Sequence, residues 1–274
     1  MLRVGTSIHC SAPWKRNNWR VRFLMASTRY EFAVDSGALS LPDGARVVLL
    51  ESTGDAVLSA LQGYELAAQV SFKPHFDALG AAGVSVSDDI NGPADAVHIT
   101  LPRSRDLARG LIAKAEAVAP GGMVIVDGAK TDGIDAILKA VKNRVPVTGQ
   151  VAKAHGKLFW FDATDAFADW QLPGPAPVAD GWITQPGVFS ADGPDAGSQA
   201  LLACLPKSLK GRGADLGGGW GFLTKSLLDL PGVTHIDLVE ADKRALDCAR
   251  LNVLDERVAF HWADATTWGD PGTW

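Results

Sequence analysis

Short apolar runs rich in β-branched residues alternate with stretches of helical hydrophobic spacing along most of the chain. The run at residues 46–50 follows the turn Pro42-Asp43-Gly44 and predicts a buried strand. Apolar residues recur at helical spacing in 103–118. The same alternation predicts strands at 65–70, 95–100, 123–126, 145–147 and 158–161, and helices at 55–61 and 134–141. Strands that alternate with helices favour a largely parallel sheet with helices on both faces.

A proline-rich segment interrupts this order, and a second α/β cycle follows it. Residues 171–186 contain four prolines, which is typical of a linker between domains. Beyond it, Asp195 can cap a helix that runs through 199–205. The pattern then predicts strands at 213–216, 236–239 and 258–262, and helices at 222–230 and 243–253. We therefore expect a basic extension at 1–24, one α/β domain at 25–170, a linker at 171–185 and a second α/β domain at 186–274.

Composition narrows the class of protein. A hydrophobic content of 47% and a charged content of 21% are ordinary for a globular protein with a core. The net charge of −5 gives no overall basic field for nucleic acid, although a local patch can suffice. Cys10, Cys204 and Cys248 are far apart, so we expect neither a disulfide framework nor a metal site, and a cytoplasmic location fits. No apolar run is long enough to span a membrane.

The first 24 residues differ from the rest because their basic side chains are unopposed by any acid. Trp14 and Trp19 interrupt the basic residues, which are Arg3, Lys15, Arg16, Arg20 and Arg22. One interpretation is a targeting leader, although the apolar core of a secretory signal is missing. The other is that Met25 is the natural start and the preceding stretch is an upstream extension.

The most specific motif is Asp215-Leu216-Gly217-Gly218-Gly219-Trp220-Gly221, an acid followed by a glycine at every second position. It predicts a strand, a tight turn and a helix whose first amides face a ligand. A Cβ on Gly217 or Gly219 would hold that ligand off the backbone. The spacing does not match the dinucleotide fingerprint, and no Gly-Lys-Ser/Thr triplet follows, so it suits S-adenosylmethionine instead.

Two further acids follow the next two predicted strands. Glu240 lies 23 residues after Gly217, close to the spacing of a ribose-binding acid. Asp264 follows the third strand, where its carboxylate could accept from an adenine amino group. Ligands of open α/β sheets bind at the carboxyl ends of strands, and Asp215 lies at such an end too. The three acids and the glycine turn therefore predict one cofactor site.

Together with these motifs, the segment 186–198 (Pro-Gly-Val-Phe-Ser-Ala-Asp-Gly-Pro-Asp-Ala-Gly-Ser) resembles the class I S-adenosylmethionine-dependent methyltransferases, and in particular the RsmC-type 16S ribosomal RNA guanine-N2 methyltransferases. The resemblance implies an α/β fold of two tandem Rossmann-like methyltransferase-type domains, of which we expect the second to be incomplete. It also implies a monomer when the protein is complete, with S-adenosyl-L-methionine as cofactor and RNA of the small ribosomal subunit as partner.

The resemblance also assigns roles to individual residues. Asp215, Gly217, Gly219 and Gly221 would line the methionine end of the cofactor, and Glu240 would hold its ribose hydroxyls. Asp264 and the amide of Ala265 would meet the adenine. Phe189 would lie against the cofactor from the preceding loop.

In this family the first domain has lost cofactor binding, and the sequence agrees. Its first strand leads into Glu51-Ser52-Thr53-Gly54-Asp55, without the acid and alternating glycines, and Thr100-Leu101-Pro102-Arg103 follows a later strand. Such a domain would serve as a scaffold or dock RNA. The candidates for phosphate contact, which could equally be a solvated surface, are Lys130, Lys153, His155 and Lys157.

One family motif is absent. The tetrapeptide Asn-Pro-Pro-Phe, which orients the target amino group in the family, does not occur, so no catalytic residue is assigned. We expect little or no methyl transfer from this chain. Two alternatives stay open: a non-catalytic remnant that binds cofactor or RNA, and a methyltransferase for another class of substrate.

Overall fold

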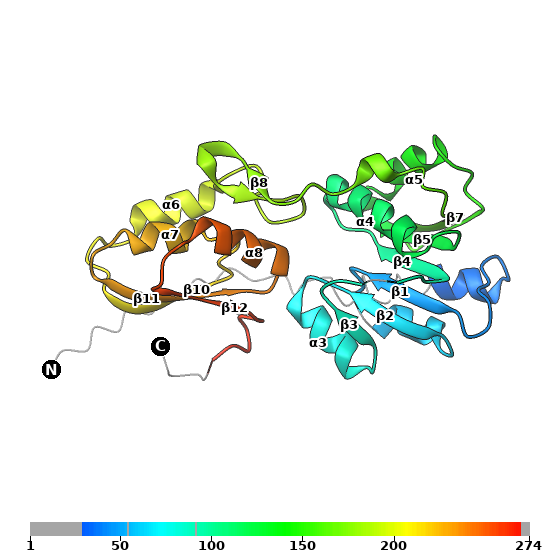
Figure 1. Cartoon of the computed structure of the whole chain (residues 1–274), viewed down its shortest axis with the longest axis horizontal. Coiled ribbons are helices and arrows are strands. Elements are labelled where there is room, and N and C mark those ends of the chain that lie inside the picture. The colour runs from blue at the N-terminus through cyan, green and yellow to red at the C-terminus, as the bar shows by residue number, and fades with distance from the viewer. Residues whose placement is uncertain (1–28, 54, 91, 270–274) are drawn as a thin grey trace.

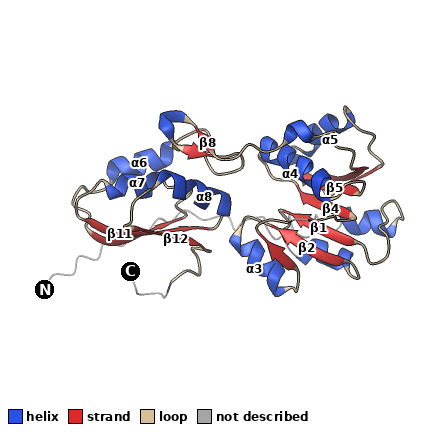
Figure 2. Cartoon of the chain, viewed as in Figure 1, coloured by secondary structure: helices blue, strands red, loops and turns tan. Residues whose placement is uncertain are grey.

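The computed structural model describes residues 29–53, 55–90 and 92–269 (Figure 1). The basic extension, Cys10 and the proposed start at Met25 lie outside these residues. The described strands form a seven-stranded sheet, a three-stranded sheet and one two-stranded pair. We call residues 29–170 the first half of the chain and residues 186–269 the second half. Figure 2 shows helices packed on the seven-stranded sheet of the first half and on the three-stranded sheet of the second half.

The sheet of the first half has the strand order β3-β2-β1-β4-β5-β7-β6. Strands β1 to β5 pair in parallel, and β7 runs antiparallel to both β5 and β6. The order reverses between β1 and β4, where ligands of open α/β sheets bind. The strands are β1 Arg46–Leu50, β2 Glu65–Gln69, β3 Ser85–Ser87, β4 Ala96–Thr100, β5 Met123–Ala129, β6 Gly149–Lys153 and β7 Gly156–Asp162.

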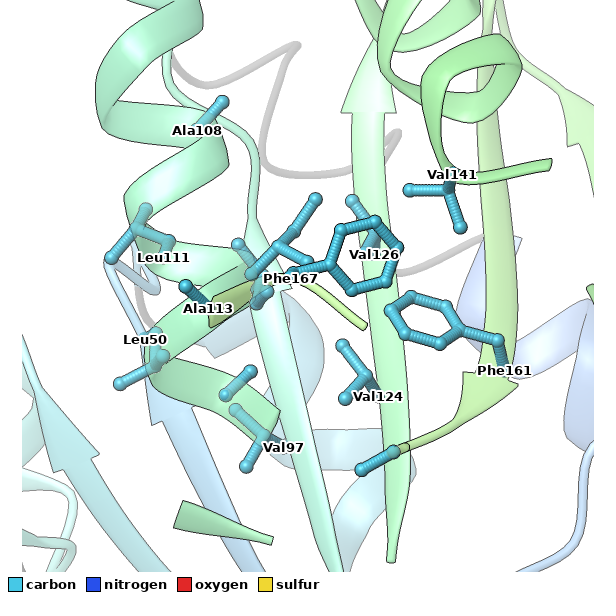
Figure 3. Packing of buried hydrophobic residues seen from close by; sticks show 14 of the residues in the cluster. Leu50, Val97, Ala108, Leu111, Ala113, Val124, Val126, Val141, Phe161 and Phe167 are labelled. Atoms are coloured by element: carbon cyan, nitrogen blue, oxygen red, sulfur yellow. The ribbon is translucent and has the colours of Figure 1, made fainter. Parts of the chain in front are cut away.

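The central strands of this sheet are buried on both faces. Val48 and Leu50 of β1 point into one apolar cluster, whereas Val47 and Leu49 point into the other. Figure 3 shows the first cluster, where α4 packs over β4 and β5. This double burial explains why these strands are continuous apolar runs in the sequence. Residues 29–35 are helical, and the labelled helices are α2 Asp55–Leu58, α3 Lys73–Ala81, α4 Arg105–Val118 and α5 Ile134–Lys142, with the 3₁₀ turns η1 Ser59–Leu61, η2 Lys130–Asp132 and η3 Ala168–Trp170.

The second half repeats the start of this topology. Its three strands, β10 Gly211–Leu216, β11 Val233–Glu240 and β12 Val258–Trp262, pair in parallel in that order. Its helices, α6 Ala196–Cys204, α7 Phe222–Leu228 and α8 Lys243–Asn252, lie over one face of the sheet in Figure 1. The Ser198 amide donates to the Asp195 side chain at 3.0 Å, which confirms the predicted cap of α6.

Some predicted elements differ from the structure. The strand expected at 145–147 is wrong: Val145 closes the end of α5, with its amide bonded to the Val141 carbonyl at 3.0 Å, and β6 follows instead. The helix expected at 55–61 is a short α-helix that tightens into a 3₁₀ turn. The expected linker contains two short paired strands, β8 Ala176–Pro177 and β9 Ile183–Thr184, and the 3₁₀ turn η4 Ala179–Gly181. The domain bounds stay a prediction.

Candidate functional site

The glycine turn joins β10 to α7, and its glycines serve two different needs. Gly217, Gly219 and Gly221 have positive φ angles of 76°, 57° and 92°, which side chains adopt only under strain. A Cβ on Gly217 or Gly219 would meet nothing within 4 Å, so the space beside them is open. A Cβ on Gly221 would lie 2.9 Å from Val253 Cγ2, so this glycine also allows α7 to pack against α8.

Asp215 lies at the base of this turn and is 9% exposed. Its Oδ2 accepts a hydrogen bond of 2.7 Å from Thr224 Oγ1, on the first turn of α7. Burial raises the pKa of the Asp215 carboxyl above its usual value, and hydrogen bonds from the hydroxyl and the amide of Thr224 oppose that rise. A buried carboxylate whose donors are neutral can take a further, cationic partner.

Glu240 ends β11, and its carboxylate points at the glycine turn. The Gly219 amide donates to Glu240 Oε2 at 2.8 Å, and the Asp242 amide donates to Oε1 at 2.7 Å. These two bonds fix the carboxylate through main-chain donors. Since each carboxylate oxygen can accept more than one hydrogen bond, both oxygens keep capacity for a ligand hydroxyl.

The third predicted acid is engaged within its own turn. Asp264 Oδ1 accepts from the amide and the hydroxyl of Thr266 at 2.8 and 2.7 Å. The Ala263 amide donates to the Glu240 carbonyl at 3.1 Å, which places the end of β12 beside the end of β11. Asp264 and Ala265 are both half-buried. The structure therefore brings these residues close to Glu240 by the main chain, and their role at adenine stays a prediction.

The loop that carries Phe189 is joined to the glycine turn. Trp220 Nε1 donates to the Phe189 carbonyl at 3.0 Å, and the Trp220 indole is buried. The Phe189 ring itself is 72% exposed. Asn252 of α8 donates to the carbonyls of Trp220 and Ile183, both at 2.8 Å, and so ties the turn to β9.

Sequence reasoning missed two supporting residues. Trp182 packs on the rings of Trp220 and Phe222, with centroid distances of 5.1 and 5.6 Å, and Asn252 makes the two bonds described above. Trp182 lies in the expected linker, and a tryptophan among prolines and glycines was the signal that this segment packs against the site. The side-chain amide of Asn252 gave no comparable signal in the sequence.

The equivalent turn of the first half lacks these features. Leu50 pairs with Gln69 as Leu216 pairs with Val239, so the strand registers place Glu51 where the second half has Gly217. Glu51 has a positive φ of 53°, at a position where the second half uses glycine. The same alignment places Val70 at the position of Glu240.

The basic candidates for phosphate contact gather at one hairpin. Lys153 and His155 flank the β6–β7 turn, Lys157 follows on β7, and the Lys130 amide donates to the His155 carbonyl at 3.0 Å. Lys157 pairs with Asp135 at 2.6 Å, and the Lys153 Nζ lies 5.1 Å from the Phe32 ring centroid. Contact with phosphate stays a prediction.

Two kinds of feature are absent from the described ranges. There, no group of three or more histidine, cysteine or acidic residues is arranged to hold a metal ion. Within the same ranges, no helix combines the length and apolar character needed to cross a membrane. Cys204 and Cys248 are both free thiols.

Comparison with known proteins shows what the second half of the chain is similar to. The methyltransferase small domain family matches residues 181–270. The ribosomal RNA small subunit methyltransferase C of Pseudomonas paraeruginosa is 31% identical over 170 residues, which cover 59% of this chain and 51% of that protein. The protein of the same name from Psychromonas ingrahamii is 28% identical over 191 residues, 65% of this chain and 54% of that protein. The chain thus spans about half the length of these relatives.

Among solved structures, the T. thermophilus 16S rRNA N2 G1207 methyltransferase (RsmC), in complex with AdoMet and guanosine, matches with a TM-score of 0.69. It is 19% identical, and the match covers 92% of this chain and 70% of that one. A match at that identity establishes the fold, a Rossmann-like methyltransferase fold. The family resemblance found in the sequence is confirmed: the chain is similar to class I S-adenosylmethionine-dependent methyltransferases of the RsmC type.

Proposed function

We propose that the second half of the chain binds S-adenosyl-L-methionine at the glycine turn, as part of an enzyme that methylates the exocyclic N2 amine of guanine in small-subunit ribosomal RNA. The observation that carries the cofactor assignment is the Glu240 carboxylate, which two main-chain amides hold beside an open bend. The RNA substrate rests on the relatives, which are ribosomal RNA small subunit methyltransferases, and on the T. thermophilus enzyme, a 16S rRNA N2 G1207 methyltransferase.

The residues present fit this cofactor. Gly217 and Gly219 leave room for a ligand against the backbone, and Asp215 offers a carboxylate to the cationic amino group of the methionine moiety. Glu240 faces the bend with oxygens that can accept from both ribose hydroxyls. When bound, the cofactor supplies an electrophilic methyl group on a sulfonium.

The remaining predicted positions complete the proposed site. Gly221 lets α7 begin close to α8, Asp264 and Ala265 would face the adenine, and Phe189 would cover the cofactor from the preceding loop. The chain's own residues therefore bind and orient the cofactor. No side chain in the sequence is assigned to proton transfer, and the target amine needs positioning more than a strong base.

Titration calorimetry with S-adenosylhomocysteine tests the cofactor site. We expect binding to the wild-type chain, and a loss of about tenfold or more in Glu240→Gln, because a hydrogen bond to a charged group is lost. Glu256→Gln, an exposed acid of the same half, is the matched control and should bind like wild type. No heat from a folded wild-type chain would refute the proposal.

Methyl transfer from labelled cofactor to small-subunit RNA tests the substrate class. The second candidate is a chain that binds cofactor or RNA without transferring the methyl group. Label in guanine N2 supports the first candidate, binding without transfer supports the second, and label in protein alone indicates another substrate class. We further propose that the chain acts as a monomer in the cytoplasm, which a sedimentation measurement and cell fractionation can check.

A further inference from the structure

Two equivalent turns pair with each other between the two halves of the chain. One follows β2 and leads into α3, and the other follows β11 and leads into α8. The Lys73 amide donates to the Ala241 carbonyl at 2.8 Å, and the Lys243 amide donates to the Ser71 carbonyl at 2.9 Å. Phe72 and Asp242, the N-cap residues of α3 and α8, form an antiparallel bridge between these bonds. This reciprocal pairing fixes one turn on the other, at the junction of the two halves in Figure 1.

The indole of Trp262, the last residue of β12, contacts both turns at this junction. Trp262 Nε1 donates to the Ala241 carbonyl at 2.8 Å and to the Ser71 carbonyl at 3.1 Å, so one donor serves both turns. The Trp262 ring packs edge-on against Phe76 of α3, with a centroid distance of 4.9 Å. A tryptophan whose N–H is hydrogen-bonded and whose ring is packed adds buried contact area and fixes the position of one turn relative to the other.

The turn held in this way is continuous with the proposed ribose acid. Glu240 is the residue directly before Ala241, and the Asp242 amide donates to its Oε1 at 2.7 Å. The other carboxylate oxygen accepts from Gly219. The orientation of the Glu240 carboxylate therefore depends on the main-chain position of Asp242, which the first half holds through its bridge to Phe72.

The Arg244 guanidinium connects side chains of the two halves at this junction. Arg244 donates to both oxygens of Asp242, from Nε at 3.1 Å and from Nη2 at 3.2 Å. Its Nη1 lies 3.5 Å from Glu51 Oε1, and the two side chains are 20% and 18% exposed. Glu51 in turn accepts from Ser71 Oγ at 3.2 Å. The planar fork of arginine matches this two-oxygen contact, which lysine cannot reproduce.

The first half can make this contact because its own turn is not free for a ligand. Glu51 stands where the second half has Gly217, and its carboxylate points to Ser71 and Arg244. A hollow of about 210 Å³ lies between the halves, with Glu51, Ser71, Lys243 and Arg244 among its walls. The region that would be the cofactor cleft of the first half thus receives a side chain of the second half.

We propose that Arg244 is a positioning residue for the cofactor ribose: through Asp242 and Glu51 it lets the first half hold the turn that orients Glu240. The inference rests on the proposed function, because it assigns a support to the same cofactor site. Arg244 does not touch the cofactor in this proposal, and its effect should fall on recognition of the ribose rather than on the ligand as a whole.

The test compares S-adenosylhomocysteine with its 2′-deoxy analogue by calorimetry, in wild type and Arg244→Met. We expect wild type to lose about tenfold in affinity when the hydroxyl is missing, because that hydroxyl bonds a carboxylate. In Arg244→Met the ratio should shrink to about threefold or less, since a mobile Glu240 discriminates weakly. Arg250→Met is the matched control: Arg250 lies on α8, is 46% exposed and pairs with Asp247, so its ratio should equal that of wild type.

A second variant and a ligand-free readout keep the proposal open to refutation. Glu51→Gln should reduce the ratio in the same direction, and it decides the matter alone if circular dichroism shows Arg244→Met unfolded. Hydrogen exchange of the Gly219 amide, which is bonded to Glu240, should be faster in Arg244→Met than in Arg250→Met. Unchanged ratios and unchanged Gly219 exchange would overturn the proposal. A wild-type chain that binds no S-adenosylhomocysteine would refute the proposed function, while Gly219 exchange would still decide the positioning role.

Discussion

Asp215 and Glu240 are both acids at strand ends, yet their surroundings differ. Glu240 is half-buried and accepts two main-chain amides from two different turns, whereas Asp215 is buried and both of its donors, a hydroxyl and an amide, belong to Thr224. A carboxylate held by two amides keeps its orientation and suits neutral hydroxyls. A buried carboxylate with few donors suits a cation, because the cation compensates a charge that burial disfavours. The two environments thus match the two ends of the proposed cofactor.

We predict that cofactor affinity falls at acidic pH because of Asp215. Burial raises the pKa of this carboxyl, so its proton returns nearer to neutral pH than for an ordinary aspartate of about 3.9. Without ligand, the folded chain binds this proton more tightly than the unfolded chain. This group's contribution to stability is therefore present below the unfolded pKa and is lost as pH rises through the raised folded pKa. Ligand affinity has the opposite dependence, since the cofactor's ammonium group needs the ionised carboxylate.

Calorimetry with S-adenosylhomocysteine from about pH 8 to about pH 5 measures this effect. Asp215→Asn should bind about tenfold or more weakly at the upper end and should lose most of the pH dependence. Thr224→Val removes the side-chain donor, one of the two bonds that oppose the rise in pKa, so its profile should move to higher pH. An Asp215→Asn variant with the wild-type profile would show that another group is responsible.

At the scale of elements, the four glycines between β10 and α7 are not equivalent. Gly219 combines a positive φ of 57° with open space, whereas Gly221 combines a positive φ of 92° with close contact to Val253. A methyl group at Gly221 would strain the backbone and also push α7 away from α8. A methyl group at Gly219 would strain the backbone and stand in the space proposed for the ligand.

We predict that Gly219→Ala and Gly221→Ala separate stability from binding. Each should lose about 1–3 kcal/mol of unfolding free energy from backbone strain, and Gly221→Ala should lose more because of its contact with Val253. Gly219→Ala should lose more cofactor affinity than its loss of stability explains. Urea unfolding and calorimetry with S-adenosylhomocysteine measure the two effects. A Gly219→Ala variant that is folded and binds like wild type would contradict the open-space argument.

The elements that could be predicted from the sequence are those whose burial leaves a pattern. β1, β4 and β5 are buried on both faces and appear as apolar runs, and α4 and α8 carry a clear apolar stripe. α3 could not be recognised because only Leu79 of its nine residues is buried. In β6 only Val151 is buried, and its position is set by pairing with β7 rather than by its own residues.

At the scale of the whole molecule, the sequence predicts the acids and glycines of the proposed site but not what supports them. Strand-end acids can be found because parallel strands bring their carboxyl ends together. The pairing of Ser71–Lys73 with Ala241–Lys243 uses main-chain atoms, so no pattern of side chains in the sequence predicts it. Arg244 looks like a solvated helix residue in the sequence, and only the fold places it between Asp242 and Glu51.

This pairing leads to a last prediction, on communication between the halves. If the first half stabilises the turn that orients Glu240, then a ligand held by Glu240 must stabilise the first half by the same free energy, because coupling between two sites is reciprocal. The Lys73 amide, bonded to the Ala241 carbonyl, reports this directly. Its hydrogen exchange should slow when S-adenosylhomocysteine binds, whereas the Ala119 amide at the end of α4 should not change. In Arg244→Met the slowing at Lys73 should be smaller, because that link between the halves is cut. If exchange slows only around the glycine turn and Glu240, the halves are neighbours without energetic coupling, and the cofactor site is built by the second half alone.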